Sequence, residues 1–156
     1  MQNYIKSQTR LAFVQYIFQN EFLDADFLEG IEDFQKHFYD TNIAIIDEKK
    51  EFKLKFNKNF LNKLFSCFKN NIDKKNIIDD LNGFIDINRK FEKWDNILKS
   101  IIFAIIAELL ITEKNKFKIV FNDYLNISKS LVSQRETKLI NAIVQRYIDK
   151  DEINKK

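Results

Sequence analysis

The 156 residues fit one domain with one contiguous hydrophobic core, and they include no proline and only two glycines. This composition argues against a β-sandwich, because sandwiches need frequent tight turns. The formal net charge of +3 permits RNA binding but falls well short of a polybasic nucleic-acid binder. The only cysteine, Cys67, excludes an intrachain disulfide, and we expect it to be a packed apolar thiol.

Two helices are predicted in the N-terminal part of the chain. Leu11, Val14, Phe18 and Phe22 recur at spacings of three and four, which places them on one face of a helix over about 4–22. A second helix is expected to begin near residue 26, where an aspartate and a glutamate have the spacing of a capping box: Asp26 and Glu29.

The segment 47–59 is highly charged and only weakly periodic. Its alternating Phe52, Leu54 and Phe56 are compatible with a short strand, but an isolated strand would have no obvious partner. We therefore expect a loop with a short extended piece.

Three helices are predicted in the middle of the chain. Apolar residues mark a third helix over 60–68 and a fourth over 77–81, which Gly83 is expected to end. A long helix over about 93–112 is apolar on most sides, so we expect it to be the buried axis of the core.

Two more helices are predicted at the C-terminal end. Apolar residues define one stripe between Val120 and Leu131. Ser133 and Glu136 have the spacing of a capping box, which predicts that the last helix begins at about Gln134. The tail 151–156 is charged and is expected to fray.

No segment has the properties of a membrane anchor or an active site. The longest apolar run, 101–111, is far below the ~20 residues that span a bilayer, and the N-terminus lacks the apolar core of a signal peptide. The only histidine, His37, cannot form a metal site alone, and no glycine-rich phosphate loop, CxxC pair or HExxH motif is present. We expect a soluble, cytoplasmic protein that is not an enzyme and needs no cofactor or metal.

Four segments carry a family resemblance. They are 7–22 (SQTRLAFVQYIFQNEF), 104–110 (AIIAELL), 117–131 (FKIVFNDYLNISKSL) and 135–148 (RETKLINAIVQRYI). In this order they resemble the NusB family of bacterial RNA-binding antitermination factors. The resemblance covers nearly the whole chain, although no single segment is specific.

The resemblance implies an all-α fold, with a single domain over 1–150 in which about seven helices pack as two helical subdomains. It also implies binding to boxA-type RNA of rRNA and leader transcripts. The implied protein partners are a small-subunit ribosomal protein that doubles as NusE and the antitermination complex on RNA polymerase. Homodimerisation is left open.

The resemblance and the chemistry of RNA recognition assign two sets of polar residues to RNA, with cations for phosphates and amides for bases. One set lies on the polar side of the first helix: Lys6, Arg10 and Gln15. The other lies at the start of the last helix: Gln134, Arg135 and Lys138. We expect both sets to share one face, and the alternative is that each simply keeps a surface soluble.

The resemblance also assigns Phe18 and Leu98 to the NusE contact, with core packing as the alternative for both. Leu139 stands where the family carries an aromatic residue, so base stacking there is in doubt. Two other functions stay open. One is a helical protein-interaction adaptor without RNA binding, and the other is a NusB-like domain detached from an rRNA methyltransferase.

Overall fold

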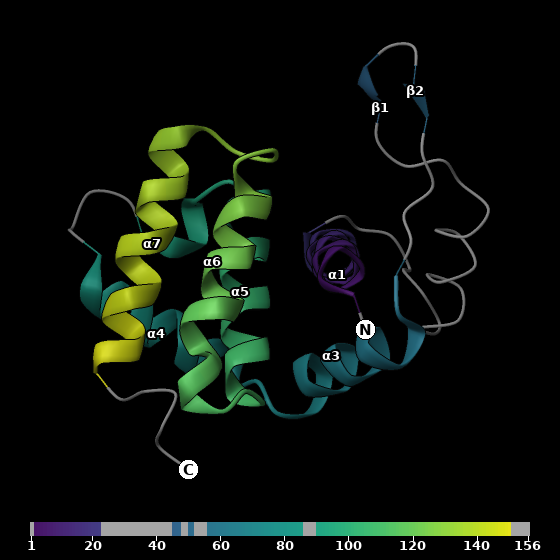
Figure 1. Ribbon diagram of the computed structural model, residues 1–156. Coiled ribbons are helices and arrows are strands. Elements are labelled where there is room, and N and C mark those ends of the chain that lie inside the picture. The colour runs from purple at the N-terminus through teal and green to yellow at the C-terminus, as the bar shows by residue number, and fades with distance from the viewer. Residues whose placement is uncertain (1, 23–44, 48–49, 52–55, 86–89, 151–156) are drawn as a thin grey trace. The chain divides into compact units, whose positions relative to one another are not determined.

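The computed structural model describes residues 2–22, 45–47, 50–51, 56–85 and 90–150 (Figure 1). This described part contains six α-helices, two 3₁₀ helices and one pair of short strands. The helices confirm the predicted all-α fold. The chain divides into two compact units, Met1–Phe65 and Ser66–Lys156, and the division falls inside helix α3.

The first unit contains α1 (Asn3–Phe22) and the first turns of α3 (Lys58–Asn70). The aromatic ring of Phe65 packs on α1, with its centroid 6.1 Å from that of Phe13 and 4.0 Å from that of Tyr16. The backbone N–H of Asn57 donates to Thr9 Oγ1 over 2.9 Å, and Asn57 Oδ1 accepts from the N–H of Phe60 over 2.8 Å. One asparagine therefore caps α3 and ties its start to α1.

The buried face of α1 differs from the predicted stripe. Ala12, Phe13 and Ile17 are fully buried, whereas Leu11 and Phe18 are only half-buried. Every residue from Leu11 to Phe18 except Gln15 is apolar, so spacing alone did not fix which side packs inward. The predicted extent of this helix is nevertheless confirmed.

A short antiparallel pair lies where the charged segment begins: β1 (Ile45–Asp47) and β2 (Lys50–Glu51), with Ile45 opposite Glu51. Strand β2 falls inside the segment 47–59, where a loop with a short extended piece is expected, and its partner β1 lies mostly before that segment. The extended piece therefore has a partner, which the sequence did not predict. The alternating residues at 52 and 54 lie outside the described residues, as do the predicted second helix, its capping box and His37.

The second unit contains the end of α3 and four more α-helices: α4 (Lys74–Phe84), α5 (Asn96–Leu110), α6 (Phe117–Ser128) and α7 (Gln134–Asp149). Two 3₁₀ turns, Phe91–Lys93 and Lys114–Lys116, precede α5 and α6. Helices α6 and α7 contact each other and both contact α5, so the three run side by side (Figure 1). Helix α4 contacts α7.

Helix α5 is the buried axis that the sequence predicted. Every residue from 98 to 109 is buried, including three polar ones: Lys99, Ser100 and Glu108. The Tyr124 hydroxyl donates to Glu108 Oε1 over 2.8 Å, and Lys99 Nζ donates to the carbonyl of Glu92 over 2.9 Å. Burial lowers the pKa of Lys99, and the nearby Glu92 carboxylate partly opposes that shift. These hydrogen bonds offset the cost of burying polar groups in the core.

The helix ends show which capping predictions hold. Gly83 does not end α4, since the helix continues to Phe84. Ile85 is the C-cap residue in an extended conformation, and its backbone N–H donates to the carbonyl of Leu81. The Ser133–Glu136 capping box is confirmed, as is the start of α7 at Gln134. None of the helices in the described ranges is long and apolar enough to cross a membrane.

Candidate nucleic-acid interface

The start of α7 is built around its capping box. Ser133 Oγ accepts from the N–H of Glu136, and Glu136 Oε1 accepts from the N–H of Ser133, each over 3.1 Å. The first four N–H groups of a helix have no partner within the helix itself. The box uses two amides, so those of Gln134 and Arg135 are left for an external acceptor.

Three predicted RNA contacts converge on this helix start. Gln134, Arg135 and Lys138 are all exposed. Lys138 follows Arg135 by three residues and Gln134 by four, which places it one turn further along the same side of the helix. Glu136 is the acidic neighbour, but its carboxylate is held by the cap. Two cations therefore lie beside the positive end of the helix dipole, an arrangement that favours an anion such as a phosphate.

Leu139 follows Lys138 and is 37% exposed. It offers an apolar surface next to the cations but no aromatic ring for stacking on a base. The side chains exposed here therefore offer charge and hydrogen bonds but no aromatic surface.

The predicted contacts on α1 differ from those on α7. Lys6 and Gln15 are half-buried, but Arg10 is 7% exposed, so the prediction that it lies on the polar surface is wrong. Its guanidinium carbon lies 5.5 Å from the centroid of the Phe60 ring, within the range of a cation–π contact. Arg10 packs α1 against the start of α3.

The two residues predicted to contact the protein partner also differ in exposure. Phe18 is half-buried and keeps some accessible surface. Leu98 is 4% exposed at the buried end of α5, which leaves almost no area for a partner and favours core packing. The α1 set lies in the first unit and the α7 set in the second, so a face shared by both sets stays a prediction.

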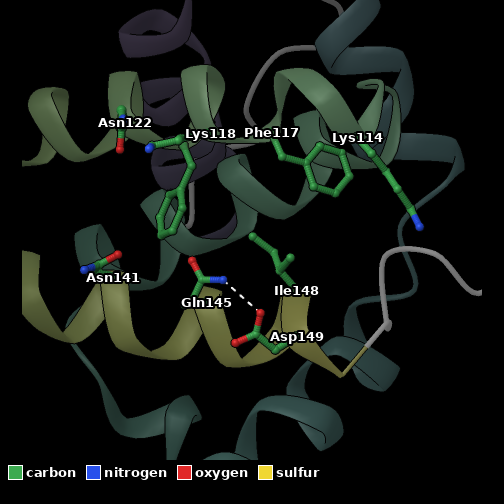
Figure 2. Close-up of a pocket in the computed structure, with 9 residues that line it drawn as sticks. Lys114, Phe117, Lys118, Asn122, Asn141, Gln145, Ile148 and Asp149 are labelled. Carbon is green, nitrogen blue, oxygen red and sulfur yellow. Dashed lines mark hydrogen bonds between the residues drawn. The ribbon is translucent and has the colours of Figure 1, made fainter.

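A groove that the sequence analysis did not identify lies between α6 and α7 (Figure 2). It has a cavity volume of about 640 Å³. Lys114, Lys118 and Asn122 follow one another at intervals of four, and Asn141 and Gln145 do the same on α7. This i, i+4 spacing of polar residues was visible in the sequence, but only the pairing of the two helices places both rows on one groove.

Across the described residues, no group of three or more histidine, cysteine, aspartate or glutamate side chains is arranged to hold a metal ion.

Comparison with known proteins assigns the chain to a family. The sequence model of the NusB family matches residues 7–149. This chain belongs to the NusB family. The match runs from the first turns of α1 to the last residue of α7, and it includes every predicted RNA contact except Lys6.

Several curated NusB-family relatives come from Rickettsia species. The chain is 26% identical over 141 residues to the transcription antitermination protein NusB of Rickettsia conorii and 25% identical to that of Rickettsia massiliae. Each alignment covers 90% of this chain and 89% of the relative. The protein of the same name from Rickettsia felis is 24% identical over the same length. No solved structure gives a significant match.

Proposed function

We propose that this NusB-family protein acts in transcription antitermination, binding boxA-type RNA together with the NusE ribosomal protein. It would do so in the cytoplasm, as part of an antitermination complex on RNA polymerase. The observation that carries the proposal is the exposed cationic start of α7, where Arg135 and Lys138 lie beside two unused backbone N–H groups. The family membership and the names of the relatives support it.

The proposed binding mode follows from the residue types. Arg135 and Lys138 bind phosphates, and the side-chain amide of Gln134 hydrogen-bonds a base edge. Leu139 can contact a base but cannot stack on it as an aromatic ring would. We therefore expect the protein alone to bind RNA weakly and the complex with NusE to bind it more tightly.

On α1 the proposed contacts are Lys6 and Gln15. Arg10 acts indirectly in this proposal, by holding α1 against Phe60, because its guanidinium is committed to that ring. Phe18 is the residue on α1 proposed to contact NusE, since it retains accessible surface.

Fluorescence anisotropy with a labelled boxA oligonucleotide tests the proposal, with a scrambled oligonucleotide of equal composition as the reference. We expect weak binding by the protein alone and at least tenfold tighter binding with NusE present. Equal affinity for the scrambled RNA, with and without NusE, would rule the proposal out.

A helical adaptor without RNA binding is the second candidate. It is favoured by the burial of Arg10 and by two exposed apolar side chains, Ile119 at 69% and Leu139 at 37%. The double variant Arg135→Glu, Lys138→Glu separates the candidates. An adaptor keeps its affinity for NusE and shows no boxA-specific binding before or after the change, whereas an RNA-binding protein loses boxA affinity.

A further inference from the structure

The groove between α6 and α7 combines three kinds of lining group in one place (Figure 2). Its volume of about 640 Å³ lies within the range of small-ligand pockets, roughly 300–1,000 Å³. All of its lining residues fall in the second unit, from Lys114 to Asp149. The groove is therefore formed by α7, α6 and the 3₁₀ turn that precedes α6.

The first kind of group is cationic. Lys114 and Lys118 line the groove, and both are exposed. Within the described ranges, neither lysine side chain takes part in a hydrogen bond or an ion pair. The one acidic lining residue, Asp149, accepts a hydrogen bond from Gln145 Nε2 over 2.9 Å. Two lysines are thus available to an anionic ligand.

The second kind of group is the side-chain amide. Asn122 of α6 and Asn141 of α7 lie on opposite walls, and both are exposed (Figure 2). An asparagine amide offers two donors and one acceptor carbonyl in a plane, which matches the edge of a nucleobase. Neither of these two side chains is hydrogen-bonded to another described residue.

The third kind of group is apolar. The ring of Phe117 and the side chain of Ile148 lie along the same groove, and both are only half-buried (Figure 2). An accessible aromatic ring can stack on a base of any sequence.

The groove also continues a row of residues from the start of α7. Lys138, Asn141 and Gln145 are spaced at three and four, so they lie along one side of the helix. At 1.5 Å per residue, this row extends about 10 Å along the helix axis. A strand held at Lys138 can therefore reach the groove without leaving α7.

We propose that the α6–α7 groove binds an unpaired nucleotide of single-stranded RNA that adjoins the sequence bound at the start of α7. Lys118 binds its phosphate, and Lys114, at the other end of the groove, binds a neighbouring phosphate of the strand (Figure 2). Asn122 and Asn141 bind the base edge, and Phe117 stacks on the base. The inference rests on the proposed RNA-binding function. An acidic peptide would use the two lysines and its backbone amides could reach the asparagines, but its carboxylate side chains offer no aromatic face to the ring of Phe117.

Extended oligonucleotides test this groove. The full-length protein is titrated with boxA RNA alone and with boxA RNA carrying three unpaired nucleotides at either end. We expect one of the two extensions to tighten binding about tenfold, an increment comparable to one stacked base with a phosphate contact. Equal affinity for all three RNAs overturns the inference, whereas failure to bind even the boxA core overturns the proposed function.

Substitutions at two exposed groove residues test whether the groove causes the tenfold gain in affinity for the extended RNA. Lys118→Glu removes a phosphate contact, and Asn122→Leu removes an amide at similar size. Each is expected to abolish most of the tenfold increment while leaving affinity for the boxA core within about twofold. Lys75→Glu, a matched charge reversal at an exposed lysine of α4, should leave the increment intact. Loss of the increment in Lys75→Glu, or its persistence in both groove variants, contradicts the proposal.

Side-chain amide resonances provide a direct readout. On addition of an RNA hexamer of uridines, the amide signals of Asn122 and Asn141 should shift. Shifts of the same size with a hexamer of glutamates would show that the groove selects acidic peptides and would overturn the nucleotide assignment.

Discussion

The start of α7 and the middle of α1 were assigned the same role from the same kind of pattern, yet they differ in the structure. At α7, Arg135 and Lys138 are exposed beside a helix N-terminus. At α1, Arg10 is buried over the ring of Phe60. Helix α7 has one buried stripe, which includes Ile143 and Tyr147, and its other side is polar. In α1 every residue from Leu11 to Phe18 except Gln15 is apolar, so this part of the helix is buried on more than one side and the adjoining Arg10 need not face solvent.

The largest expected effect tests whether the cations at the start of α7 bind RNA. The double variant Arg135→Glu, Lys138→Glu should weaken boxA binding by roughly 100-fold, because two phosphate contacts become repulsive, and this corresponds to about 2.7 kcal/mol. The free energy of unfolding should change by less than about 0.5 kcal/mol, since both side chains are exposed. Anisotropy and urea unfolding measure the two quantities.

The control for this variant is the pair Lys63→Glu, Lys75→Glu, which makes the same charge change at exposed lysines of α3 and α4. An equal loss of boxA affinity in the control would show that net charge, and not the α7 start, governs binding.

Arg10→Ala tests the α1 side and should show the reverse pattern. We expect a loss of about 1–2 kcal/mol in the free energy of unfolding, because the cation–π contact with Phe60 and the packing of the side-chain stem are lost. Affinity for boxA should fall less than threefold. Arg10→Lys is the control, since it keeps the charge but loses the planar stacking surface. Unchanged stability together with a large loss of RNA affinity would show that Arg10 is a direct RNA contact.

Ser133→Ala tests the helix cap of α7 without changing the cations beside it. The substitution removes the acceptor for the N–H of Glu136 and should lower the free energy of unfolding by about 1 kcal/mol. Ser133→Asn keeps a capping oxygen and should cost only a few tenths of a kcal/mol. Chemical denaturation distinguishes the two. If both variants are equally destabilised, the hydroxyl of Ser133 does not stabilise the helix through its cap.

The smallest expected effect is on the pH dependence of stability, and it concerns Glu92, which lies outside both proposed RNA-binding sets. A hydrogen bond from the side chain of Asn82, over 2.6 Å, is the main cause that lowers the pKa of Glu92, and its own backbone N–H adds to the shift. A carboxylate with a lowered folded-state pKa stabilises the protein above its unfolded pKa, and this stabilisation is lost as the pH falls through the folded value.

Glu92→Gln should therefore flatten the acid limb of the stability curve between about pH 5 and pH 3, measured by thermal unfolding. RNA affinity near neutral pH should not change. Parallel stability curves for the variant and the wild type would contradict the assignment of this hydrogen bond.

Much of the fold could be predicted because strong local signals agreed with the packing. The extent of α1, the burial of α5 and the capping box at Ser133 each follow from residue spacing, and each is confirmed. The family resemblance is confirmed by the match over 7–149.

The features that the sequence missed depend on contacts between segments. The β1–β2 pair requires a partner strand that periodicity does not reveal. Gly83 permits a helix end without enforcing one, and Ile85 provides it instead. The inward position of Arg10 depends on Phe60, fifty residues away, and the groove depends on how α6 lies against α7. Spacing within one helix cannot supply such information.

The buried thiol of Cys67 can serve as a native reporter of local unfolding. Its Sγ donates to the carbonyl of Ala107 over 3.1 Å, and the side chain is 3% exposed. A thiol-reactive dye should therefore label the folded protein slowly, at a rate set by transient separation of the end of α3 from α5. Because no other cysteine is present, the labelling rate at increasing urea reads out the local free energy of that separation without an engineered probe.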